Sequence, residues 1–416
     1  MTLSPSFAPE ARRLLSLARK DKRSAEKELA QLSPEQQASV IVEAPHTIRR
    51  QMIELITDPE SVIPLIPEAE FCYTCRSIGL ADASWLLPMA TEEQIVACLD
   101  LDAWRGFQID LKRLDAWMVA LTTSDDTITT AGTGEDGLQT VVRAAQAFDP
   151  ELLVIYLRSH IDVSIKPSEQ DDPDWSPPDQ SQTLEGQFYF VAKDPKDDLS
   201  AMLVLLHALF QEDYWLYFRV IQAVREELAP ENEEWALRWR TGRLEDLGFP
   251  SWDKAMRIYG FLRPDRMADL PKDPSTLDLY DGSLPIEASD LPGASEDERA
   301  IFRATRELDA GERSSVFYAL IALANRVAVA DRMELGDPDS LPLAIEKATR
   351  FASDGLEFIA QENGLSLEQT LRSVPIERLF RVGTNLDREA ALPDPLPLDD
   401  SNDADDQNNE IDANTA

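Results

Sequence analysis

Apolar residues recur three and four positions apart along most of the chain, which is the spacing of one buried helical face. The stretch 40–56 shows the pattern through Val40, Ile41, Ile48, Met52, Ile53, Leu55 and Ile56. Such segments are short, and a helix of a dozen residues is marginal alone in water, so neighbouring helices have to stack to bury these faces. The pattern therefore predicts an all-α fold built as a superhelical array of short helices.

Helix-start signals support this prediction. A capping side chain precedes a proline at Ser33-Pro34, Asp58-Pro59, Asp149-Pro150, Asp194-Pro195 and Asp337-Pro338. Proline loses no hydrogen bond at the first helical position, and the capping oxygen satisfies a later amide. Capping boxes are predicted at Thr91/Gln94, Ser295/Glu298 and Ser366/Gln369. A four-residue opening also repeats at 32–35, 65–68 and 228–231, with a variant at 148–151, as in helical-hairpin repeats.

Polar stretches at 122–137, 166–182 and 264–294 divide the chain. We expect five parts: a basic N-terminal helix over 1–30, a helical repeat array over 31–121, a middle helical module over 138–263, a C-terminal helical domain over 295–390, and a tail over 391–416. Aromatic and β-branched residues in Gln187–Ala192 predict a small β-hairpin near 184–192. The tail has acids and no base, which predicts disorder.

The net charge of −37 limits the classes of partner. A surface this acidic disfavours nucleic acid and anionic membranes, whereas a basic protein or divalent cations are compatible with it. The longest apolar stretches, 201–210 and 316–330, fall short of the roughly 20 residues that a bilayer crossing needs. No secretory signal opens the chain, so we expect a cytoplasmic protein without membrane insertion.

Few residues indicate chemistry. Cys72 and Cys75 have a C-x-x-C spacing that Cys98 and His46 could complete as a zinc site, but no second tight pair is present, and we interpret the three thiols as core residues. His207 lies in an apolar stretch and is expected to be a hydrogen-bonded core histidine. Phosphate-binding glycine loops are absent from the sequence. We therefore predict no catalytic residue, cofactor or bound metal.

The acidic tail contains one further pattern. Asp399 to Glu410 places acids at positions that resemble a calcium loop, but Ala404 stands where such a loop needs glycine. We interpret the match as chance in an Asp-rich segment. Mg²⁺ or Ca²⁺ is expected to bind weakly at most.

Segment 233–249 is the main candidate for an interaction or structural motif. Its candidate residues are Glu234, Trp235, Arg238, Trp239, Arg240, Arg243 and Asp246. Arginines interleaved with tryptophans could stack on bases or hold a phosphate. Glu234 lies four residues before Arg238, however, and Asp246 lies three after Arg243, so each arginine has an intrahelical partner within reach. We favour a structural ion-pair network beneath two packed tryptophans.

Two resemblances follow from these residues. Residues 32–41 (LSPEQQASVI) resemble the repeat opening in the intracellular N-terminal domain of MgtE-type magnesium transporters, a superhelix of short helices. The segment 233–249, with Gly186 and its strand before it and Val374–Gly383 after it, resembles a bacterial family of unknown function over most of residues 10–390. That resemblance implies a soluble helical protein and supplies no reaction.

Together these features predict a non-enzymatic cytosolic scaffold or adaptor that binds another protein on a concave superhelical surface. A divalent-cation-responsive regulator is the alternative, based on the acidic surface and the transporter-like opening. An uncharacterised enzyme is the third possibility.

Overall fold

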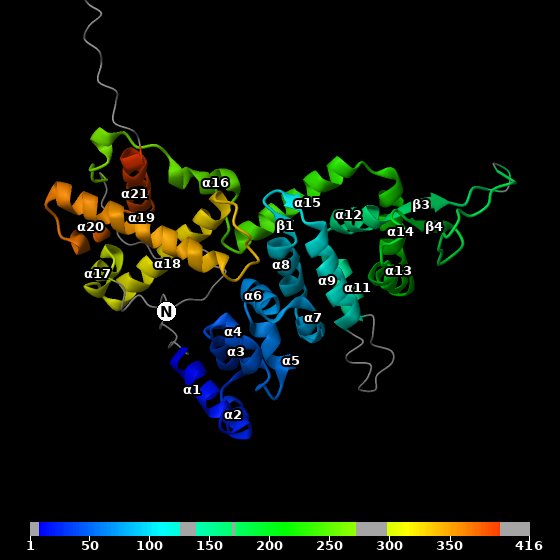
Figure 1. Ribbon diagram of the computed structural model, residues 1–416, viewed down its shortest axis with the longest axis horizontal. Helices are drawn as coiled ribbons and strands as arrows, with labels where there is room; N and C mark the ends of the chain where they lie inside the picture. Colours follow the sequence, from blue (N-terminus) through cyan, green and yellow to red (C-terminus); the bar gives the residue numbers. More distant parts are fainter. Residues whose placement is uncertain (1–7, 125–138, 169, 171, 272–297, 392–416) are drawn as a thin grey trace, which may run out of the picture.

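The computed structural model describes residues 8–124, 139–168, 170, 172–271 and 298–391. Within them it contains 20 α-helices and two small antiparallel strand pairs. The predicted all-α fold with a small β-hairpin is therefore confirmed. Figure 1 shows an N-terminal helical array, a middle group of helices to its right and a C-terminal group to its left.

The N-terminal array consists of short helices that bury their apolar faces against one another. They are α1 (Ala8–Ala18), α2 (Lys22–Leu29), α3 (Pro34–Val42), α4 (His46–Ile53), α5 (Pro59–Val62), η1 (Ile63–Leu65), α6 (Glu68–Ile78), α7 (Leu80–Ala83), η2 (Ser84–Met89), α8 (Glu92–Asp102) and α9 (Leu111–Ser124). The segment predicted as one basic helix contains two, because Asp21 caps a second helix by accepting a hydrogen bond from the Ser24 amide. The Thr91/Gln94 capping box is confirmed at the start of α8.

A two-residue turn interrupts the array after α8. Strands β1 (Trp104–Arg105) and β2 (Gln108–Ile109) pair in antiparallel fashion around Gly106 and Phe107. Gly106 has a φ of +61°, a conformation that glycine adopts without steric cost. The sequence pattern did not predict this turn, which projects Phe107 from the array.

The middle group joins helices to the second strand pair. Its elements are α11 (Gln139–Ala147), α12 (Pro150–His160), β3 (Ile161–Ile165), β4 (Phe188–Ala192), α13 (Ser200–Glu212), α14 (Tyr214–Glu226) and α15 (Ala229–Asp246). The predicted strand at Gln187–Ala192 exists as β4, but it pairs with β3, which lies outside the expected 184–192. The Asp194-Pro195 signal gives a turn instead of a helix, in which the Lys196 amide donates to Asp194.

The C-terminal group is a packed set of longer helices. Its elements are α16 (Trp252–Met256), η3 (Arg257–Tyr259), η4 (Pro264–Arg266), α17 (Ala300–Arg306), α18 (Ala310–Ala330), α19 (Ser340–Asn363), α20 (Leu367–Ser373) and α21 (Ile376–Ala391). Helix α16 packs on α18, although the predicted middle module extends to residue 263. A Cβ on Gly355 would lie 2.0 Å from the Leu379 carbonyl oxygen, so glycine permits the close contact of α19 with α21.

Several candidate residues are core residues with no sign of chemistry. Cys72, Cys75 and Cys98 are free and fully buried in the array, as expected. His207 is exposed, which corrects the prediction of a core histidine, because the helical period places it on the solvent face of α13. Ser295 of one predicted capping box and the calcium-like segment Asp399 to Glu410 lie outside the described residues.

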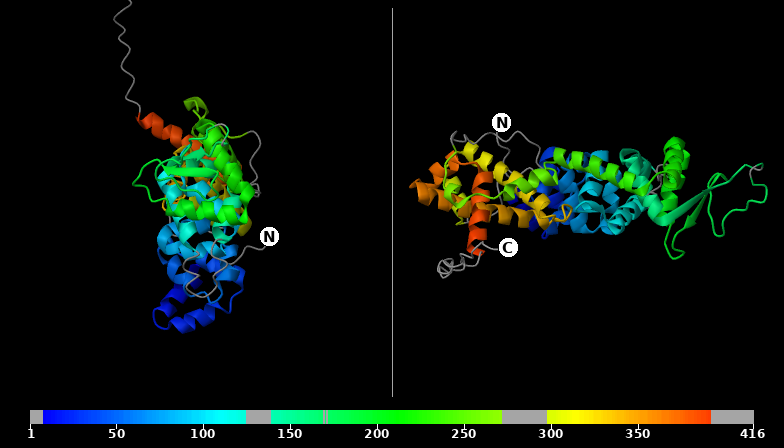
Figure 2. Two further views of the ribbon diagram at one scale, coloured as in Figure 1. Left: turned by 90° about the vertical axis from the view of Figure 1, so that its right-hand side faces the viewer. Right: turned by 90° about the horizontal axis from the view of Figure 1, so that it is seen from above.

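Helix α15 connects the three groups. It packs on α8 of the array and on α12 of the middle group, and its C-terminal end leads into α16. Figures 1 and 2 show it running across the array between the middle and C-terminal helices. Across the part of the chain that the structure describes, no helix is long and apolar enough to span a membrane.

Candidate interaction site on helix α15

Helix α15 has local sequence features that favour helix formation at both ends. Pro230 occupies the first turn, where a missing amide costs nothing, and Glu231 adds negative charge near the positive end of the helix dipole. Arg243 places a positive charge in the last turn. The helix has one buried side, which includes Asn232, Ala236, Arg240 and Leu244, and one broad exposed side.

The buried side centres on an ion-pair network around Arg243. Its guanidinium holds Asp100 of α8 at 2.6 and 2.9 Å and Asp149, before α12, at 2.7 and 2.9 Å. The Asp100 side chain is only 3% exposed. Burial raises the pKa of Asp100, and the hydrogen bonds and charge of Arg243 oppose that increase. The network therefore neutralises the buried carboxylate and joins α8, α15 and the start of α12.

Arg240 is buried one turn before Arg243. Its Nε donates to the Asp100 carbonyl oxygen at 2.7 Å and its Nη1 to the Gly106 carbonyl oxygen at 3.2 Å. The guanidinium lies 4.9 Å from the centre of the Trp104 ring. Burial lowers the pKa of Arg240 to about 10, so it is charged at neutral pH. Arg240 thus attaches α15 to the β1–β2 turn through backbone acceptors instead of a direct ion pair.

These contacts correct the partners predicted from spacing. Arg243 pairs with Asp100 and Asp149 of other elements, and not with Asp246. Arg238 lies 5.1 Å from the ring centre of Trp235, and among the described residues it forms no ion pair with Glu234. Asp246 lies within intrahelical reach of Arg243. The carboxylates of Asp100 and Asp149 on other elements are removed from water, however, and therefore bind Arg243 more strongly.

The two tryptophans are the largest departure from the sequence prediction. Trp235 is 45% exposed and Trp239 is 49% exposed, and their rings stack with centres 6.1 Å apart. Leu228, the N-cap residue of α15, is also exposed. We name Trp235 and Trp239 the tryptophan stripe. It presents apolar surface to solvent, whereas the sequence predicts two packed tryptophans above the ion-pair network.

A cavity of about 540 Å³ lies at the C-terminal end of α15, where Arg243, Asp246 and Leu247 line it. Carboxylates from three helices line it: Glu68, Glu92, Glu93, Asp100 and Asp246. Its apolar wall includes Val96, Ala97, Ala147 and Leu247, and among the described residues that line it Arg243 is the one basic residue. Asp246 follows Trp239 by seven residues, so the stripe and this acid-rimmed cavity share one side of α15.

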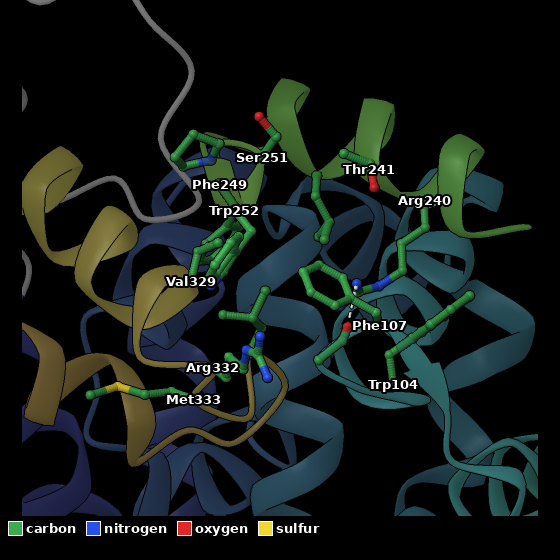
Figure 3. A pocket seen from close by; sticks show the side chains of 14 residues that line it. Trp104, Phe107, Arg240, Thr241, Phe249, Ser251, Trp252, Val329, Arg332 and Met333 are labelled. Atoms are coloured by element: carbon green, nitrogen blue, oxygen red, sulfur yellow. Dashed lines mark hydrogen bonds between the residues drawn. The ribbon is translucent and has the colours of Figure 1, made fainter. Parts of the chain in front are cut away.

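A smaller cavity of about 60 Å³ lies where the array, α15 and the C-terminal group meet. We call it the aromatic pocket. Figure 3 shows Trp104, Phe107 and Arg240 on one side of it and Trp252 and Arg332 on the other. The Arg332 guanidinium lies 5.4 Å from the Phe107 ring centre and 5.3 Å from the Trp252 ring centre.

Comparison with known proteins identifies a family. A model described as a family of unknown function (DUF6178) matches residues 26–391. The chain belongs to DUF6178. No curated protein and no solved structure matches it. The resemblance to the magnesium-transporter domain is not among these findings and stays a prediction.

The DUF6178 match covers every residue of the ion-pair network, the tryptophan stripe and the two cavities. The sequence pattern identified the residues that α15 contributes to these sites, but not the residues that other elements contribute. Asp149 was interpreted as a helix cap, and among the described residues it forms no side-chain cap bond because its carboxylate binds Arg243. No local signal connected Asp100, Phe107 or Arg332 with α15, since these residues lie more than 80 positions away along the chain.

Proposed function

We propose that this chain is a non-enzymatic adaptor that binds a basic segment of another protein along α15. The exposed, stacked Trp235–Trp239 pair beside the acid-rimmed cavity is the observation that carries the proposal. Large exposed aromatic side chains cost solvation free energy unless a partner covers them, and tryptophan is over-represented among residues that dominate binding energy.

Charge indicates the chemistry of the partner. Glu68, Glu92, Glu93 and Asp246 surround the cavity, whereas the positive charge of Arg243 is already paired with two carboxylates. A lysine or arginine entering the cavity would meet carboxylates there, and a neighbouring one could lie on a tryptophan face. Cavities of roughly 300–1,000 Å³ accommodate ligands of drug size, and this one has room for a long side chain.

This proposal places the binding surface on α15 and not in a groove of the repeat array. It keeps the adaptor role expected from composition and gives the partner a positive charge.

The cation-responsive alternative rests on the acidic composition and the transporter-like opening at 32–41. Among the described residues, no group of three or more metal-ligating side chains is placed to hold an ion, so no structural observation favours that alternative.

A direct binding experiment tests the adaptor proposal. The probe is a fluorescein-labelled peptide rich in lysine and leucine, titrated against the full chain and followed by fluorescence anisotropy. Trp235→Ala/Trp239→Ala should weaken binding by roughly tenfold or more, because two contact residues are truncated. Glu92→Gln/Glu93→Gln should weaken it and reduce its dependence on salt.

Trp215→Ala is the matched control, because Trp215 is an exposed tryptophan on α14 outside the stripe and the cavity. It should bind the probe as the wild type does. The same four proteins should then be used to capture native partners, with the captured proteins identified by mass spectrometry. Equal peptide affinity and an identical set of captured proteins for all four would refute the proposal.

A further inference from the structure

The aromatic pocket has an unusual balance of polar groups. The chain has 77 acidic and 40 basic side chains, yet the 14 residues that line this pocket include two arginines and no carboxylate. Arg240 and Arg332 therefore give the pocket a positive potential within an acidic protein.

Three of the residues that line it have hydrogen-bond donors without a partner among the described residues. The indole N–H groups of Trp104 and Trp252 are buried and find no acceptor there. Nη2 of Arg240, which is not fully buried, forms no hydrogen bond with the described residues, since the two bonds of its guanidinium use Nε and Nη1. A buried donor without an acceptor costs about 1–3 kcal/mol. A ligand suited to this pocket must therefore supply acceptors and negative charge.

The backbone at Arg332 is a second, independent observation. Arg332 has a φ of +56° at the position after the C-cap of α18, where the Met333 amide donates back to the Ala328 carbonyl. Glycine usually occupies this position, because any side chain is strained there. An arginine in its place keeps an exposed guanidinium against the edge-to-face pair of Phe107 and Trp252 rings, whose centres lie 6.1 Å apart, in spite of that strain.

The size and walls of the pocket restrict the ligand further. A volume of about 60 Å³ exceeds the roughly 10–15 Å³ that one water needs by a factor of about five. That space suits four or five heavy atoms. Leu244, Phe249, Val329 and Leu335 provide apolar walls, which a purely inorganic anion would leave without contact.

We propose that the aromatic pocket binds a small free carboxylate with a short alkyl chain, of the size of acetate or propionate. Its carboxylate accepts hydrogen bonds from the donors around the pocket, and its alkyl carbons contact the apolar wall. This site is separate from the tryptophan stripe and does not depend on the adaptor proposal.

The first measurement uses the full chain and sodium propionate as the probe, with sodium chloride at equal ionic strength as the reference. At ten times its dissociation constant, propionate should raise the melting temperature by roughly 2 °C over chloride. Acetate should act similarly, and benzoate, which is larger than the pocket, should have less effect. Nitrate is the control for a general anion site, and it should raise the melting temperature less than propionate does.

A second measurement locates the bound probe. The chain has eight tryptophans, so ¹⁵N-labelled indoles give one N–H signal each. Propionate should shift the signals of Trp104 and Trp252 and leave that of Trp215 in place, because Trp215 lies outside the pocket. Shifts at Trp215 alone would place the binding elsewhere and overturn the proposal.

Variants separate binding from folding. Arg332→Gly removes the guanidinium and relieves the backbone strain, so the fold should survive while affinity for propionate falls at least tenfold. Arg332→Gln retains hydrogen-bond donors without the charge and should weaken affinity in the same direction if Arg332→Gly proves unstable. Arg350→Ala is the matched control, because Arg350 is an exposed arginine on the Phe351 ring, outside the pocket. Wild-type affinity in both Arg332 variants, an equal effect of nitrate, or no effect of propionate beyond chloride would overturn the proposal.

Discussion

Two arginine sites, the ion-pair network of Arg243 and the aromatic pocket with Arg332, use positive charge differently. In the ion-pair network, Arg243 holds two carboxylates through four hydrogen bonds. At the aromatic pocket, Arg332 is exposed and packs against two rings, and the described residues offer its guanidinium neither a carboxylate nor a hydrogen bond. The described part of the protein occupies four of the five N–H donors at the first site and none at the second.

The comparison shows how an arginine that stabilises the fold differs from an arginine that is available to a ligand. A guanidinium that binds two carboxylates through four of its five donors contributes to stability and has little hydrogen-bonding capacity left for a ligand. One without such partners contributes little to stability and retains its donors. Arg238, Arg240 and Arg243 look equivalent in sequence, yet their partners give each a different environment.

Replacing Arg243 with Ala should have the largest effect on stability. Asp100 would stay buried without its partner, and breaking a buried pair this way costs about 3–5 kcal/mol. Urea unfolding at pH 7 measures the change. Arg303→Ala, which breaks the exposed Arg303–Glu357 pair, is the control and should cost less than about 1 kcal/mol. Equal losses of stability in the two variants would mean that the Arg243 network stabilises the fold no more than an exposed ion pair does.

The pH dependence of that loss should identify Asp100 as its cause. Burial raises the pKa of Asp100, and removing Arg243 takes away the charge that opposes the increase. A carboxyl with a raised pKa in the folded state is least costly when protonated, so the deficit of Arg243→Ala should shrink as pH falls from 7 towards 5. Adding Asp100→Asn should make the remaining deficit independent of pH. A deficit that grows on acidification would contradict this assignment.

Substitutions of Arg332 should change the free energy of unfolding less, and the glycine variant should be more stable than the alanine variant. Arg332→Gly and Arg332→Ala both remove the guanidinium, but only glycine relieves the positive φ, so the glycine variant should be about 1 kcal/mol more stable than the alanine variant. Guanidinium chloride unfolding of both proteins measures this difference. If alanine equals glycine, the backbone at Arg332 is not strained.

The exposed tryptophans should contribute least to folding. Trp235→Ala/Trp239→Ala should change the free energy of unfolding by less than about 1 kcal/mol, because both rings remain half exposed. Trp117→Ala is the contrast, since Trp117 is fully buried and donates to Asp102 at 2.9 Å, and its loss should cost about 3–5 kcal/mol. Circular dichroism melts compare the variants. A large loss in the double variant would mean that the stripe is structural.

Sequence patterns predicted the helices better than the contacts between them. Ser33, Thr91 and Ser366 cap helices through side chains close in the chain, so local chemistry was sufficient. Asp149 precedes a helix as predicted, but its carboxylate binds Arg243, 94 residues away. A capping pattern therefore predicts where a helix starts. It does not predict the partner of the capping side chain when a buried cation lies nearby.

The amino-acid sequence by itself determined the helical class, most helix starts, the burial of the three cysteines and the acidic charge, because each depends on spacing or composition. Tertiary structure decided which side of α15 is buried, and therefore that Arg240 is buried and Arg243 partly buried while Trp235 and Trp239 face solvent. It also brought Phe107, Trp252 and Arg332 together from three distant segments. The physical reason is that α15 has apolar or aromatic residues on more than one side, so its own periodicity could not choose a buried face. The carboxylates of Asp100 and Asp149 fixed the buried side, because the Arg243 guanidinium can bind both of them at once.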